Sequence, residues 1–167
     1  VFYFYSIEDK ELTVKDVKGF DKVLSFSYAP KGDKIVISAV SNGQTDMYIY
    51  NTSGGGKIQL TNDLYDDLNP RFVDNERIVF ASNRLSDTIT PRDVEINFLS
   101  SKNDIFVYPI IQYNRTFKYL ERITNTPEIN ETQPFSIGAN KYQFLSDENG
   151  LYNRFESNKD SSIAFID

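Results

Sequence analysis

The chain has 167 residues, enough for one domain that buries roughly 70% of the surface its unfolded form exposes. Its 24 acidic and 18 basic residues give a net charge of −6. No cluster of Lys and Arg suited to phosphate binding is present, which argues against a nucleic acid partner. The absence of Cys and His excludes thiol nucleophiles, disulfides, Ser-His-Asp triads and His-based zinc sites. The longest apolar stretch covers residues 105–113 and includes a proline, so it is too short to span a membrane.

A similar segment occurs three times along the chain. It reads KIVIS, RIVFAS and KYQFLS, anchored on Ile35, Ile78 and Tyr142, with separations of 43 and 64 residues. A second apolar run follows each segment and begins 12 positions later, at Met47, in the first unit, and 27 positions later, at Ile105, in the second. The middle unit therefore carries about fifteen additional residues between its two runs, which explains most of the longer second separation.

These runs are predicted to be β-strands. They contain four to six β-branched or aromatic residues with a period of two, and turn sequences such as PKGD, SNGQ and ENG separate them. We expect 34–39 to pair with 46–50 and 77–82 to pair with 104–108, with little helix anywhere. Each of the first two units closes on a further run ending in Leu-Thr or Ile-Thr. Four antiparallel strands every 40 to 45 residues are typical of a propeller blade.

The repeats resemble the WD40-like repeat of TolB, the translocation protein of the Tol system. In that repeat a Pro-x-Trp-Ser-Pro-Asp-Gly turn precedes Ile-x-Phe-x-Ser, and a Gly-x-x-x-Ile-Tyr run and a terminal Leu-Thr follow. The Trp is absent here, and Lys31 stands at the turn Asp of the first unit. The matching residues are Tyr28, Pro30, Gly32, Ile35, Ile37, Ser38, Gly43, Met47, Tyr48, Leu60 and Thr61, then Pro70, Phe72, Ile78, Phe80, Ser82, Ile105, Phe106, Ile123 and Thr124, then Pro134, Phe144, Ser146 and Gly150.

The predicted fold class is all-β: a β-propeller arc of about three and a half four-stranded antiparallel blades. Residues 1–18 would end one blade, 19–61 would form a blade, 62–124 a blade with an insertion at 85–102, and 125–167 a further blade. Closed propellers usually have four to eight blades, so we expect the chain to belong to a longer propeller protein. Its exposed apolar blade faces would then be covered by further blades or by a partner.

The insertion indicates where a partner would bind. In the topology that the resemblance implies, loops between second and third strands and links between blades open onto one rim. The insertion 85–102 lies there with 41–45, 62–69 and 125–132. A long loop in a short repeat favours a binding role, and a tolerated surface insertion is the alternative. The candidate partner-binding residues are Tyr65, Asp66, Asp67, Arg84, Asp87 and Arg92, with Tyr65 and Tyr113 as exposed aromatic anchors.

No cofactor or metal is predicted. The acids Asp63, Asp66 and Asp67 offer oxygen ligands for Ca²⁺, but they lack DxDxDG spacing and Asp is an ordinary turn residue. The segment TSGGGK lacks the first Gly and the final Ser or Thr of a phosphate loop. A single SDENG has Glu148 where the Asp-box of sialidase propellers has Asp, and is read as a hairpin turn.

The resemblance implies a non-catalytic scaffold that docks other proteins in a periplasmic or other extracytoplasmic envelope assembly, with no enzyme activity, cofactor, nucleic acid or direct membrane span. The alternative is the propeller domain of a hydrolase. That domain would be either a substrate-gating domain of a peptidase or a glycan-active propeller that works through carboxylates and Tyr.

Overall fold

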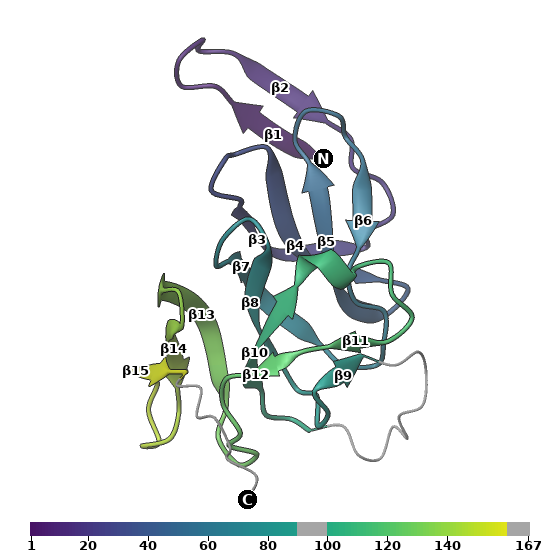
Figure 1. Cartoon of the computed structure of the whole chain (residues 1–167). Helices are drawn as coiled ribbons and strands as arrows, with labels where there is room; N and C mark the ends of the chain where they lie inside the picture. Colours follow the sequence, from purple (N-terminus) through teal and green to yellow (C-terminus); the bar gives the residue numbers. More distant parts are fainter. Residues whose placement is uncertain (90–99, 160–167) are drawn as a thin grey trace, which may run out of the picture.

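The computed structural model describes residues 1–89 and 100–159, and this part of the chain is all-β apart from one 3₁₀ turn, η2 (Ile110–Gln112). Figure 1 shows successive antiparallel sheets that follow the chain from the N-terminus to the C-terminal part. The predicted all-β class is confirmed. None of the helical structure in the described ranges is long and apolar enough to cross a membrane.

The strands group into a hairpin and three blades. The N-terminal hairpin contains β1 (Phe2–Tyr5) and β2 (Leu12–Lys15). The first blade contains β3 (Lys22–Tyr28), β4 (Lys34–Ser41), β5 (Gln44–Asn51) and β6 (Lys57–Gln59). The second contains β7 (Asp67–Phe72), β8 (Arg77–Ser82), β10 (Asp104–Pro109) and β12 (Glu121–Arg122). The third contains β13 (Glu131–Gly138), β14 (Lys141–Ser146) and β15 (Asn153–Asn158).

The two predicted strand pairings are confirmed. Strand β4 pairs with β5 from Lys34 opposite Asn51 to Ser41 opposite Gln44, across a two-residue Asn-Gly turn with positive φ at both positions. Strand β8 pairs with β10 from Arg77 opposite Pro109 to Ser82 opposite Asp104. The division of the chain at residues 18, 61 and 124 stays a prediction.

The second blade is buried on both of its faces, as expected for strands whose side chains are apolar on both sides of the sheet. Ile78 and Phe80 pack toward the first blade, in one core with Val36 and Met47. The alternate residues of β8 pack against Tyr142 and other side chains of the third blade. Strand β7 lies against both β3 and β13, so the first strands of the three blades run side by side at one edge of the stack, as the innermost strands of a propeller do.

The two ends of the stack differ in chemistry. At one end, Phe2 and Phe4 of the N-terminal hairpin cover the apolar face of the first blade. The opposite side of that hairpin exposes Tyr3, which is 70% accessible, and its cross-strand neighbour Val14. At the other end, polar side chains of β14 and β15 bond to one another on the far side of the third blade. These are Lys141 with Glu156, Gln143 with Glu156, and Arg154 with Gln143.

Part of the insertion belongs to the fold rather than to a surface loop. Strand β9 (Thr88–Ile89) pairs with β11 (Lys118–Tyr119). Ile89 is buried in the core between the first and second blades, and the amide of Leu120 donates to the carbonyl of Asp87 at 2.7 Å. Residues 87–89 of the predicted insertion 85–102 are therefore part of the folded blade. Residues 90–99 lie outside the described residues.

Candidate functional site: a buried acid cluster beneath the rim

A buried ion-paired cluster joins the first and second blades. Asp63 lies in the link between these blades, Asp67 begins β7, and Arg84 follows the end of β8. The Arg84 guanidinium contacts Asp63 at 3.0 Å and Asp67 at 2.7 Å, and all three side chains are buried. Although burial opposes it, the charges of Asp67 and Asp63 raise the pKa of Arg84. Burial raises the pKa of Asp67, against the lowering effect of Arg84.

Asp46 adds a third carboxylate that the sequence interpretation did not select. One carboxylate oxygen from each of Asp46, Asp63 and Asp67 lies within 4.8 Å of the other two. Asp46 is only 1% exposed, and burial, followed by the charges of Asp67 and Asp63, raises its pKa to about 7. The Oδ2 atom of Asp46 accepts a hydrogen bond from Gln59 at 3.1 Å. The Oδ1 atom of Asp46 and the Oδ2 atom of Asp67 have no hydrogen-bond partner among the described residues.

The charge balance of this cluster favours a proton over a divalent metal. Three carboxylates are the hard oxygen ligands that Ca²⁺ prefers. Two basic side chains already lie near, however: Arg84, and Lys118, whose pKa is lowered by burial although the charges of Asp63 and Asp46 oppose this. A divalent ion would leave a net positive charge in a buried site, whereas one proton on Asp46 makes the group neutral. The absence of a metal site stays a prediction, and this charge balance favours it.

The cluster is too enclosed for catalysis. A general base must come within hydrogen-bond distance of its substrate. Asp46 has a pKa suited to that role, but its side chain is sealed between two blades. What the cluster provides is a buried contact between the link, β7 and the end of β8.

The predicted partner-binding residues divide into two groups. Asp67 and Arg84 are buried in the ion pair, and Tyr65 is 6% exposed with its ring 5.2 Å from the Arg84 guanidinium. The expectation that Tyr65 is an exposed anchor is therefore wrong, because its ring covers the cluster. Asp66 and Asp87 are exposed, Tyr113 is exposed as predicted at 42%, and Arg92 lies outside the described residues.

Above the cluster, the loops expected on one rim do meet. The amide of Asp66 donates to Asn83 at 2.8 Å, and the Asn83 side chain donates to the carbonyl of Ser100 at 3.1 Å. Arg122 contacts both Asp87 and Asp104 at 2.6 Å. A hollow of about 50 Å³ lies between both flanks of the insertion and the link that follows the second blade. Its lining includes Leu85, Ser100, Lys102, Asn125 and Pro127.

The joint between the second and third blades repeats part of this arrangement. Glu131 begins β13 as Asp67 begins β7, and each faces the Ser that ends its neighbouring strand, Ser146 or Ser82. The position corresponding to Arg84, two residues after that Ser, is Glu148. Burial raises the pKa of Glu131 to about 7, and Glu148 adds to the effect.

The recurrence of Asp-Met-Tyr at 46 and Asp-Ile-Phe at 104 was the sequence signal that could have identified Asp46.

The described residues form consecutive blades of an open β-propeller arc, held by buried polar joints. No protein-family model and no curated protein sequence matches the chain. Solved structures show that the propeller is TolB-like. A protein described as TolB from Agrobacterium tumefaciens superposes with a TM-score of 0.57 at 17% identity, over 78% of this chain and 40% of that one. TolB from Acinetobacter baumannii gives a TM-score of 0.58 at 16% identity, over 81% of this chain and 29% of that one. The chain thus spans less than half the length of these proteins, and the likeness establishes the fold.

Proposed function

We propose that this chain is a non-catalytic protein-binding scaffold whose partner surface is the rim formed by the insertion and the neighbouring inter-blade links. The observation that carries the proposal is the fixed base of that rim. Arg84 holds the start of the insertion onto Asp63 and Asp67 of the neighbouring link, so the loops above it are presented by a rigid support. Loops placed on a rigid scaffold are where binding residues concentrate.

The exposed chemistry of the rim fits a polar partner surface. Asp66 and Asp87 are exposed carboxylates at its edge, and Lys102, beside them, is bonded to Asp147 at 3.2 Å. Exposed charges of this kind steer association and select partners more than they add affinity. The resemblance to TolB supports an extracytoplasmic envelope assembly as the setting of this interaction.

Site-specific photo-crosslinking tests the position of this surface. A photoreactive residue placed at Asp66 or Asp87 is expected to crosslink to the same partner protein. The matched control is Lys31, an exposed residue in the turn between β3 and β4, which lies at the opposite rim. Equal crosslinking at Lys31, or none at Asp66 and Asp87, would overturn the proposal.

A shortened insertion gives a second test. Deleting 86–101 would remove β9 and the buried Ile89, so the blade itself would be damaged. Replacing only 90–99 with a short Gly-Ser linker keeps β9 and Ser100 in place. Partner binding is expected to weaken about tenfold or more while the melting temperature stays within a few degrees. Unchanged binding would place the partner surface elsewhere.

A further inference from the structure

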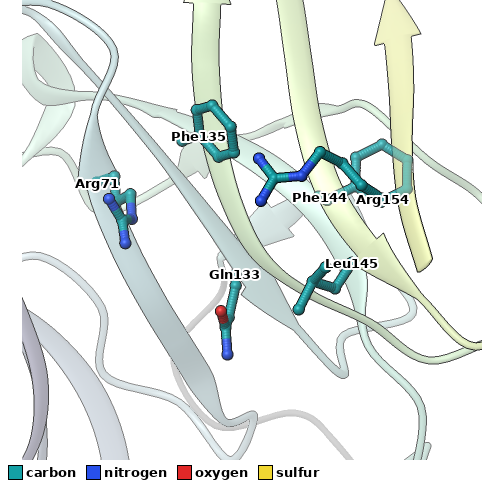
Figure 2. A pocket seen from close by; sticks show the side chains of 6 residues that line it. All are labelled: Arg71, Gln133, Phe135, Phe144, Leu145 and Arg154. Carbon is teal, nitrogen blue, oxygen red and sulfur yellow. The ribbon is translucent and has the colours of Figure 1, made fainter. Parts of the chain in front are cut away.

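A hollow of about 270 Å³ lies at the innermost strands of the second and third blades. Figure 2 shows its lining: Arg71 comes from β7 of the second blade, and Gln133 and Phe135 come from β13 of the third. Phe144 and Leu145 of β14 and Arg154 of β15 complete it. The hollow therefore spans the line where two blades meet.

The two guanidinium groups face this hollow from opposite sides (Figure 2). Arg71 is exposed, and among the described residues its side chain has no hydrogen-bond or ion-pair partner. Arg154 uses one N–H toward Gln143 at 3.1 Å and stacks over Phe135 at 5.2 Å, which leaves its other N–H groups free to bind. The nearby acid, Glu156, is already held by Lys141 at 2.7 Å and by Gln143. The hollow is a positively charged site in a protein of net charge −6.

The rest of the lining combines one amide with apolar surface. Gln133 sits at a bulge of β13 with φ of 51°, a left-handed conformation that turns its side chain out of the normal strand alternation. Phe135, Phe144 and Leu145 supply apolar walls. These walls offer apolar contact beside the two exposed guanidinium groups.

The internal repeat shows that the charge is a local addition. Ser27 pairs with Val36 in the first blade, Arg71 with Val79 in the second, and Phe135 with Gln143 in the third. Arg71 thus occupies a position at which the two other blades carry the uncharged Ser27 and Phe135. The charge at this position is particular to the second blade, and the aromatic residues beside it in the hollow come from the third.

We propose that this hollow binds a carboxylate that carries an adjacent aromatic or aliphatic group, supplied by a partner peptide. Arg71 and Arg154 hold the carboxylate oxygens, Gln133 donates a further N–H, and the Phe135 and Phe144 side of the hollow receives the apolar group. The planar fork of Arg suits two parallel bonds to a carboxylate. The surface differs from the rim, so this inference does not depend on the proposed scaffold role.

The test is an NMR titration of the folded chain with four small probes. N-acetyl-phenylalanine offers a terminal carboxylate, and N-acetyl-aspartyl-phenylalaninamide offers a side-chain carboxylate beside an aromatic ring. N-acetyl-phenylalaninamide lacks the charge, and inorganic phosphate lacks the apolar group. At least one carboxylate probe is expected to bind about tenfold more tightly than both the amide and phosphate, and to weaken as salt is raised. The tighter of the two carboxylates identifies a peptide C-terminus or an acidic side chain as the source.

Variants locate the binding. Arg71→Gln and Arg154→Gln are each expected to weaken the carboxylate probe about tenfold, whereas Arg71→Lys keeps the charge and recovers only part of the affinity. Arg115→Gln, at another exposed arginine, is the matched control and should bind as the unaltered chain does. Equal binding of acid and amide, equal binding of phosphate, or unchanged binding in both Gln variants would each overturn the proposal.

Discussion

The Arg84 guanidinium and the Asp67 carboxylate lie 2.7 Å apart, and both side chains are completely buried where the first and second blades meet. Asp67 belongs to β7, the first strand of the second blade, and Arg84 follows β8, the second strand of the same blade. The same guanidinium also contacts Asp63 in the link from the first blade. This one side chain therefore connects the link between two blades, the innermost strand and the start of the insertion.

Replacing Arg84 with Met is expected to destabilise the chain by about 3–5 kcal/mol, because it leaves Asp63 and Asp67 buried without their positive partner. Urea unfolding followed by circular dichroism measures the loss. The exposed Arg115→Met is the control and should change stability by about 0.5 kcal/mol or less. A loss at Arg84 no larger than the control would show that the pair contributes little to the joint.

The Asp46→Asn variant is expected to gain stability relative to the unaltered chain as the pH rises from 5 to 8. The folded-state pKa of Asp46 is about 7 against 3.8 for a free side chain, so the native state binds more protons than the unfolded state between these values. Native stability therefore falls as pH rises through this window, by up to about 1.4 kcal/mol per pH unit from this group. The neutral amide removes that fall. Urea unfolding of both proteins from pH 5 to 8 checks it, and a constant difference would contradict the titration of Asp46.

Glu148→Arg is expected to stabilise the joint between the second and third blades. It would give Glu131 the positive neighbour that Asp67 has in Arg84, and so lower the pKa of Glu131 from about 7. A gain of about 1 kcal/mol at pH 8 is reasonable for a partly exposed pair. NMR titration of the Glu131 carboxyl carbon reports the pKa. Glu8→Arg makes the same charge change in the N-terminal hairpin turn, and an equal gain there would attribute the effect to net charge.

The chain is expected to associate at high concentration through the exposed side of the N-terminal hairpin. Tyr3 and Val14 are opposite each other on that surface, and exposed contiguous apolar side chains favour association. The double variant Tyr3→Glu, Val14→Lys places an opposite-charge pair there and should yield a monomer in sedimentation velocity. Asn158→Lys, at the other end of the stack, should associate as the unaltered chain does. A monomeric unaltered chain at millimolar concentration would contradict this expectation.

Strand positions could be predicted from the sequence because period-two apolar runs and Asn-Gly turns are local signals. The pairing of β4 with β5 follows from such a turn alone. The burial of Arg84 could not be predicted that way. Its partners lie 17 and 21 residues earlier, and a charged residue in a loop is ordinarily exposed. Tyr65 was misplaced for the same reason, since an aromatic residue outside a strand gives no local sign that it covers a buried guanidinium.

The unlike ends of the stack restrict how copies of this chain can join. A head-to-tail contact would press the hairpin surface around Tyr3 onto the polar side chains of Lys141, Gln143 and Glu156. Those groups would lose water without gaining partners, which is costly. Two hairpin surfaces, by contrast, match each other across a two-fold axis and bury apolar groups on both sides. We therefore expect self-association of this chain to stop at closed pairs and not to propagate into open filaments.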